Sequence, residues 1–178
     1  MIQRARRLAD HWLDILIAVV FWCLLWGGFS FQDIAGGLLA TAIVHILFPM
    51  PSISRELSLR PLAFIWFVAK FLFDMVVSAV QIAWYAIRPG EQPGASVIAV
   101  QMASRSDLFL TITAGLSTLI PGSVVVEAQR GTGTIFLHVI GAETPEEAEA
   151  ARVRVREQEH RLLRALARRD VLKEAGLA

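Results

Sequence analysis

The sequence contains one cysteine, Cys23, and no marked excess of either charge, with a net charge of +1. A single cysteine excludes an intrachain disulfide and a zinc-type Cys/His cluster. The near-zero net charge argues against a nucleic-acid-binding protein, because such proteins concentrate basic residues on one face. Charged residues make up only 19% of the chain and hydrophobic residues 55%, against about 25% and 45–50% in ordinary soluble domains. The composition therefore predicts an integral membrane protein.

The recognisable catalytic motifs are also missing. There is no Walker motif, no dinucleotide-binding fingerprint and no His-x-x-x-His pair. Ser123 lies in Pro-Gly-Ser-Val, which lacks the strand–nucleophile–helix context of a hydrolase elbow. We therefore expect a protein that is not an enzyme, with no catalytic residues, no cofactor and no metal site.

Two apolar runs predict a transmembrane helical hairpin at residues 12–48. The first run extends from about Trp12 to Phe29 and the second from about Ile34 to Phe48, with a polar tip between them. A membrane-spanning helix needs about 20 apolar residues, so the second run is short and its flanks must help it to reach the interface. The short connection predicts that the two helices are antiparallel.

Basic residues flank the hairpin and are absent from its tip. They precede the first run and follow the second, at Arg4, Arg6, Arg7, Arg55 and Arg60. Because Lys and Arg accumulate in cytoplasmic loops, this distribution places the basic N-terminus, residues 1–11, and the loop after the hairpin in the cytoplasm of a cell-membrane protein.

Small residues recur four apart in the second span, as Gly36 with Ala40 and Gly37 with Thr41. This spacing lets helix backbones approach closely in lipid. Two interpretations remain open: packing against the first span, or contact with another subunit. In the same span, His45 is interpreted as an interhelical hydrogen-bonding group rather than a functional site.

A third helix is predicted over residues 61–88, and it is amphipathic. Its polar residues fall at spacings of three and four, which places them on one helical face; they are Lys70, Asp74, Ser78, Gln81, Tyr85 and Arg88. The helix is either a tilted span with this stripe facing partner subunits, or an interfacial helix with the stripe facing water or protein. The interfacial alternative, which we favour, keeps the C-terminal domain in the cytoplasm.

The first two residues of this stripe, Lys70 and Asp74, can neutralise each other across one helical turn. Inside a membrane such charges are costly and often mark an ion pathway. A polar lining near an ion route is therefore one hypothesis for Lys70, Asp74, Ser78 and Gln81. An interfacial stripe or an inter-subunit contact is the alternative, and we favour it.

After a Pro-Gly-rich linker at 89–95, residues 96–178 predict a small α/β domain. Its order is strand, helix, strand, strand, helix, over residues 96–103, 106–120, 123–128, 134–140 and 145–172. Ser104-Arg-Ser-Asp107 matches a capping box at the first helix start. The Arg/Glu pattern of the last helix indicates a solvated face. The fold class is thus a membrane α-helical N-terminal region followed by this α/β domain.

Three segments of the domain resemble a known family. They are the helix and turn Leu108–Ser123, the strand Val124–Glu127 and the strand Ile135–Val139, which carries His138. They are similar to the E subunit of multisubunit (Mrp-type) Na⁺/H⁺ antiporters, whose leucine-rich helix ends in Thr-Pro-Gly-Thr before a strand with an apolar-apolar-His-apolar run. The family often has Asn, Thr and Thr where this chain has Gly115, Ile120 and Ser123.

The resemblance implies an accessory, non-catalytic subunit of a monovalent cation (Na⁺)/proton antiporter. Its partners would be the other integral membrane subunits and the lipid bilayer, without nucleic acid. Pro121, Gly122 and His138 match the family pattern, and we interpret them as a structural motif, with His138 as a hydrogen-bonded structural histidine. A membrane-anchored module that binds a ligand or a protein through the α/β domain is the alternative function.

Overall fold

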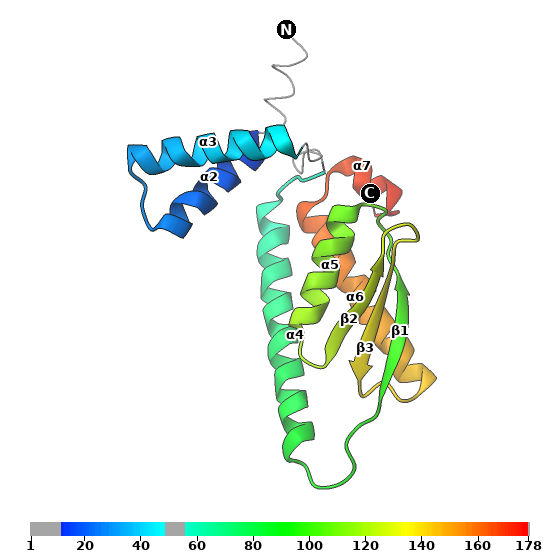
Figure 1. The fold of residues 1–178 in the computed structure, drawn as a ribbon. Helices are drawn as coiled ribbons and strands as arrows, with labels where there is room; N and C mark the ends of the chain where they lie inside the picture. The colour runs from blue at the N-terminus through cyan, green and yellow to red at the C-terminus, as the bar shows by residue number, and fades with distance from the viewer. Residues whose placement is uncertain (1–11, 49–55, 178) are drawn as a thin grey trace. The chain divides into compact units, whose positions relative to one another are not determined.

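The computed structural model describes residues 12–48 and 56–177, with side chains from residue 15 onward. The chain divides into two compact units, Met1–Leu57 and Ser58–Ala178. It is mostly helical and contains a small antiparallel sheet of three strands (Figure 1).

The first unit is a helical hairpin of α2 (Trp12–Trp26) and α3 (Phe31–Leu47). Ser30 and Asp33 form a capping box that satisfies amides at the start of α3. The small residues of α3 pack on α2, since a Cβ on Gly37 would lie 3.1 Å from the Trp22 ring. Packing within the hairpin was one of the two interpretations of the small-residue spacing.

The second unit contains α4 (Pro61–Ile87) and the α/β elements. These are β1 (Ala95–Gln101), α5 (Asp107–Leu119), β2 (Ser123–Gln129), β3 (Thr134–Ile140), α6 (Pro145–Leu166) and the short α7 (Arg169–Glu174). The strand order is β1-β3-β2, with both pairings antiparallel. Inward residues of the sheet pack against α5 and α6 to form the core, which includes Ile98, Val100, Ile135, Leu137, Leu110 and Val155.

The opposite face of the sheet is exposed. Val97 and Val124 flank His138 in the strand register, and both valines are more than half exposed. A bulge between Val125 and Glu127 interrupts the β2 edge. Bulges and charges are common means by which edge strands avoid pairing with other chains, so β2 carries two of these devices.

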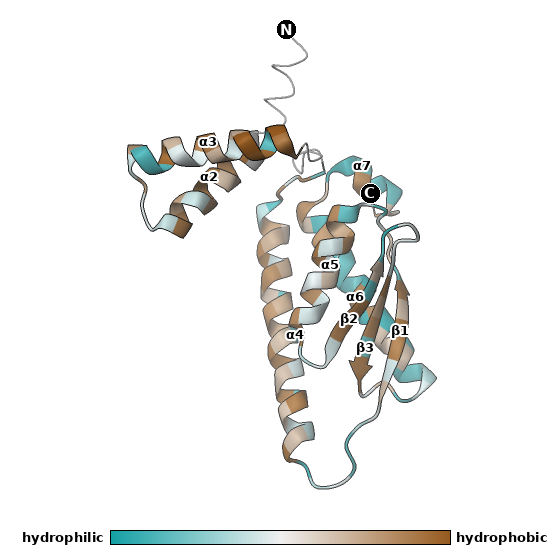
Figure 2. Ribbon diagram, in the orientation of Figure 1, coloured by the Kyte–Doolittle hydropathy of each residue, from teal (hydrophilic) through white to brown (hydrophobic). Residues whose placement is uncertain are grey.

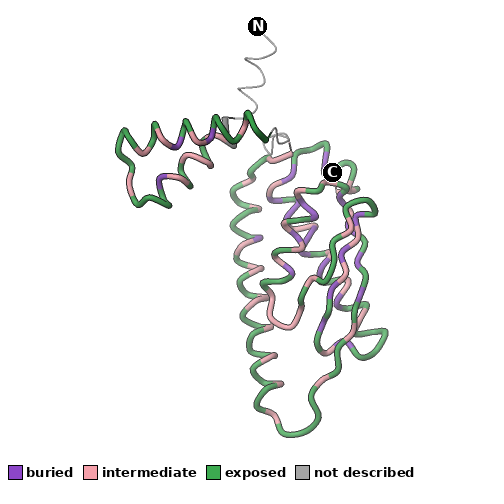
Figure 3. Tube along the Cα trace, in the orientation of Figure 1, coloured by how far each residue is buried: buried purple, intermediate pink, exposed green. Residues whose placement is uncertain are grey.

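The α4 helix packs along α6 within the second unit. Before the helix begins, the amides of Ser58 and Arg60 donate to the carbonyls of Leu166 (2.7 Å) and Ala165 (3.0 Å). The opposite side of α4 is apolar and exposed (Figures 2 and 3), with Leu62, Ile65, Trp66, Phe73, Val76, Val80, Trp84 and Ile87 all at least 58% exposed.

Among the described helices, α4 alone is long and apolar enough to cross a membrane, by length and composition. The α2 and α3 helices have 15 and 17 residues, or about 22–26 Å at 1.5 Å per residue. Each is shorter than the hydrocarbon core of a typical bilayer, which is about 30 Å thick. The transmembrane hairpin therefore stays a prediction.

Two local predictions about the domain are wrong. The cap of α5 is Ser106, whose hydroxyl accepts from the Phe109 amide, while Ser104 instead accepts from the Ser106 amide. The last helix was predicted to continue to Leu172, but α6 ends at Leu166, and the extended N-cap residue Arg168 precedes a separate helix, α7. The segment after α6 turns there because its apolar residues, Val171 and Leu172, are buried.

Candidate functional site: a polar cavity between α4, α5 and α6

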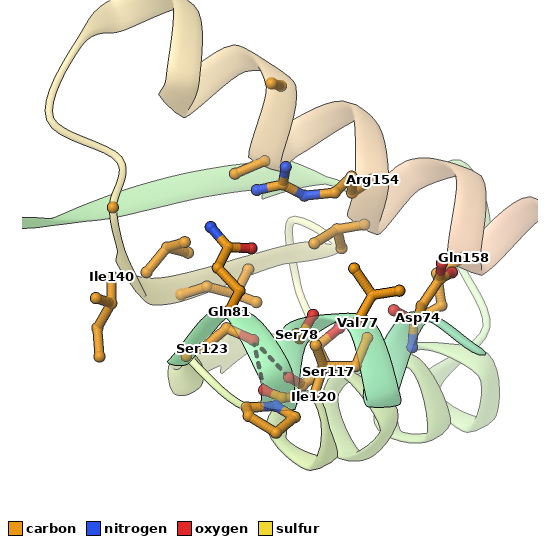
Figure 4. Close-up of a pocket in the computed structure, with 18 of the residues that line it drawn as sticks. Asp74, Val77, Ser78, Gln81, Ser117, Ile120, Ser123, Ile140, Arg154 and Gln158 are labelled. Carbon is orange, nitrogen blue, oxygen red and sulfur yellow. Dashed lines mark hydrogen bonds between the residues drawn. The ribbon is translucent and has the colours of Figure 1, made fainter. Parts of the chain in front are cut away.

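The polar stripe of α4 faces the α/β elements of its own unit. Lys70, Asp74, Ser78, Gln81 and Tyr85 all line one cavity of about 460 Å³, whose other walls come from α6, β3 and the end of α5. Figure 4 shows Asp74, Ser78 and Gln81 on α4 opposite Arg154 and Gln158 on α6. Five of the six residues that the sequence placed on one face thus line this cavity, and Arg88 does not.

Asp74 lies at the centre of an ion-pair network. Its carboxylate pairs with the Lys70 ammonium on α4, and its Oδ2 lies 3.4 Å from Nη2 of Arg161 on α6. Arg161 also pairs with Glu157 through Nη1, at 3.5 Å. These side chains are 22–60% exposed, so each pair contributes at most about 1 kcal/mol. The network neutralises Asp74 and positions α4 against α6.

Pro121 and Gly122 form the corner between α5 and β2. Gly122 has φ +91°, a conformation that favours glycine, and a Cβ there would lie 2.8 Å from Ile82 on α4. The Ser123 hydroxyl donates to the Ser117 carbonyl at 2.8 Å, which satisfies a free acceptor at the end of α5. This corner therefore lies close to α4 at Ile82, and the interpretation of Pro121 and Gly122 as a structural motif stays a prediction.

His138 does not reach this cavity. Its side chain lies on the exposed face of β3, between Val97 and Val124 in the register. The residues of the same strand that line the cavity are Leu137, Val139 and, at the strand end, Ile140. Pro121 and Gly122, with which the family pattern groups His138, line the cavity, whereas His138 does not.

His45, in the first unit, lies beside a backbone oxygen of its own helix. Nδ1 of the ring is 3.0 Å from the Thr41 carbonyl oxygen. A carbonyl oxygen only accepts hydrogen bonds, so Nδ1 carries the proton in this contact. The contact satisfies one ring nitrogen within α3.

Two buried polar groups of the cavity lack a partner in the described part of the chain. They are Nε2 of Gln158 and Oγ of Ser117, on residues that are 4% and 2% exposed. Arg154 forms no ion pair within residues 56–177 as described. Gln81, by contrast, donates to the Tyr85 hydroxyl at 2.7 Å.

Glu147 lines the same cavity from the first turn of α6. Hydrogen bonds from the backbone amide of Thr144, and then of Glu143, lower the pKa of this carboxyl below its usual value. Because the carboxylate already accepts these two bonds as part of a capping box, it serves chiefly to cap the helix.

Sequence analysis did not identify Glu159, which is buried in the domain. The last helix was predicted to present a solvated charged face, but Glu159 is only 1% exposed. Its two carboxylate oxygens accept from the amides of Ala103 and Ser104, both at 2.9 Å. The prediction was wrong here because the loop after β1 has free amides that need acceptors, and periodicity does not reveal them.

Comparisons with known proteins identify one family. Residues 15–165 match the MNHE family, described as Na⁺/H⁺ ion antiporter subunit. Among solved structures, the chain is similar to a chain in the structure of the Mrp complex from Dietzia sp. DQ12-45-1b, at 24% identity and a TM-score of 0.45, over 61% of this chain and 100% of that one. The search of curated proteins found no match.

Proposed function

The chain belongs to the MNHE family of Na⁺/H⁺ antiporter subunits, and from this premise we propose that it is an accessory subunit of a multisubunit antiporter, which contributes to assembly or stability rather than to ion movement. Its partners would be the other integral membrane subunits. The family match covers most of the chain, so both the hairpin and the α/β domain belong to this role.

The ion pairs of Lys70 and Asp74 are the observation that carries the accessory role. These were the sequence candidates for an ion route, and Asp74 is neutralised by Lys70 and Arg161 inside the cavity. A carboxylate that already faces two cationic groups is a poor ligand for Na⁺, because those groups compete with the ion for its charge. The hypothesis of a lining near an ion route is therefore the less favoured one.

The packing of α4 supports an interfacial position for that helix. The neighbouring α6 contains five Glu and five Arg in 22 residues. If α4 crossed the bilayer with this packing intact, α6 would enter the hydrocarbon core, where each charge costs several kcal/mol (~3). We therefore infer two spans, from the hairpin alone, and place the apolar face of α4 on the membrane surface and the α/β domain in the cytoplasm.

Sidedness of the C-terminus tests this topology. We expect a green fluorescent protein fused after Ala178 to fluoresce and an alkaline phosphatase fused there to be inactive, because the first folds in the cytoplasm and the second in the periplasm. The reverse pattern would show that α4 crosses the membrane.

Sodium tolerance and assembly test the accessory role. In a strain that lacks this gene, we expect reduced sodium tolerance and loss of the other subunits from the purified complex. Complementation with Asp74→Asn should restore tolerance, because the ion pairs that it removes stabilise the domain by only about 1 kcal/mol each. An Asp74→Asn complex that assembles fully but transports no Na⁺ would assign the stripe to the ion route.

The cavity itself favours one second function, a membrane-anchored module that binds a ligand. A volume of about 460 Å³ lies within the range of small-molecule sites, roughly 300–1,000 Å³. One subunit can have both roles. The domain that would bind the ligand is packed against α4, and α4 is part of the membrane-associated region proposed for the accessory role.

A further inference from the structure

We propose that the cavity between α4, α5 and α6 binds an organic oxyanion, a molecule with a phosphate or carboxylate group that pairs with Arg154. Every residue that lines the site belongs to the second unit. It goes beyond the accessory role and does not depend on it.

The charges of the cavity leave Arg154 as the available cation. Lys70 and Arg161 are paired with Asp74 and Glu157, and the remaining acid, Glu147, accepts from backbone amides. Figure 4 shows the Arg154 guanidinium and the Gln81 amide toward one end of the cavity, with Asp74 and Gln158 toward the other. Guanidinium groups bind carboxylates and phosphates through paired hydrogen bonds, which suits an anion at this end.

The buried groups without partners indicate the same ligand chemistry. Nε2 of Gln158 can only donate, and the Ser117 hydroxyl can donate as well. Both residues line the cavity, and both atoms are buried with no hydrogen-bond partner among the described residues. Buried donors are normally paired, so a ligand that supplies acceptor oxygens at this wall would satisfy them. A cation or an amine would leave the Gln158 amide unsatisfied, because Nε2 only donates.

The walls fit an organic anion larger than a bare ion. Val77, Ile82 and Leu137 contribute apolar surface beside the polar groups. Two kinds of ligand present the same phosphate group: a soluble phosphate ester and the headgroup of an anionic phospholipid. The second kind is close at hand if the exposed apolar face of α4 rests on a membrane.

Calorimetric titration of the full-length chain in phosphate-free detergent tests the proposal. The probes are sn-glycerol 3-phosphate, dihexanoylphosphatidylglycerol and, as a zwitterionic control, dihexanoylphosphatidylcholine. We expect saturable binding of at least one anionic probe. Saturation by phosphatidylglycerol alone would assign the site to a lipid headgroup, and saturation by glycerol 3-phosphate to a soluble ester. If neither anionic probe saturates, the proposal is overturned.

Matched variants establish that the binding is at this site. Arg154→Gln should raise the Kd at least about tenfold, as expected when a charge-assisted contact is lost. Arg156→Gln is the control, because Arg156 pairs with Glu149 and does not line the cavity; its Kd should stay at the wild-type value. Equal affinity in wild type and Arg154→Gln would refute the assignment.

A third variant separates binding from folding. Gln158→Leu removes the unpartnered amide, so the melting temperature without ligand should be unchanged or higher, while the Kd should rise. A variant that loses stability and retains binding would show that Gln158 has its partner inside the protein. Because these measurements use the isolated chain, their failure leaves the antiporter role intact.

Discussion

Replacement of Glu159 by Gln tests how the buried carboxylate holds the loop between β1 and α5. Glu159 is 1% exposed, and its two oxygens accept from the amides of Ala103 and Ser104 at 2.9 Å each. Gln keeps one acceptor oxygen and turns an NH₂ group toward the second amide. One amide therefore stays paired and the other is left facing a donor in a buried position.

The cost follows from these two bonds. A hydrogen bond to a charged group contributes about 1.5–3 kcal/mol, and a buried unpaired donor costs about 1–3 kcal/mol. We expect Glu159→Gln to destabilise the second unit by about 2–3 kcal/mol. For a unit of this size about 1 kcal/mol corresponds to ~4 °C, so the melting temperature should fall by about 8–12 °C.

Thermal unfolding followed by circular dichroism measures this fall, and hydrogen exchange localises it to the amides of Ala103 and Ser104. Glu157→Gln is the matched control, since Glu157 is 60% exposed and forms only a surface ion pair; its melting temperature should change by no more than about 4 °C. If the two variants melt together, or exchange at the loop does not accelerate, the buried carboxylate does not hold this loop.

Three further predictions concern other elements. Gly122→Ala forces a side chain into a positive-φ conformation and should destabilise the second unit by about 1–2 kcal/mol, as measured by thermal unfolding. Gly115 has open space around it, so Gly115→Ala should not destabilise the unit. The pKa of the Glu147 carboxyl is lowered in the folded protein, so the carboxylate contributes its full stabilisation above the unfolded pKa of about 4.3. This stabilisation is lost as the pH falls through the folded pKa. In an acid titration, Glu147→Gln should therefore lose less stability over that pH window than the wild type. Gly37→Leu should separate α3 from Trp22 at a cost of about 1–3 kcal/mol, which would be measured as a lower unfolding temperature in detergent. Ala35 lies on the exposed side of α3, so Ala35→Leu should unfold at the wild-type temperature. An equal effect of both variants would contradict this packing.

The sequence predicted the helices and strands well where local signals were strong. Pro61 at the start of α4 and the Thr144-Pro145 start of α6 are helix signals that act within one turn. The strand Thr134–Ile140 has the bounds that the sequence predicted. The end of α6 was missed because Leu166 to Leu172 has no glycine or proline, and the break depends on burial of the residues that follow.

The candidate site was predictable only in part. Helical spacing placed Lys70, Asp74, Ser78 and Gln81 on one face, since three- and four-residue spacings share a face. The residues that complete the cavity, Arg154, Gln158 and Arg161, lie more than 70 positions away on a helix whose charges resembled an ordinary solvated surface. Local periodicity contains no information about which distant helix a polar face will meet, so this part required the tertiary structure.

The α4 helix shows why hydropathy and packing give different indications of membrane position. Its average hydropathy meets the criterion for a spanning helix, because an average over all sides is dominated by the apolar residues. The polar minority, however, is concentrated where α6 lies, and Asp74 pairs with Arg161 across that contact. A helix with one side covered by charged protein has only the other side for lipid. As long as this contact persists, α4 and the α/β domain behave as one body, and a partner or membrane that binds the apolar face of α4 also positions the cavity.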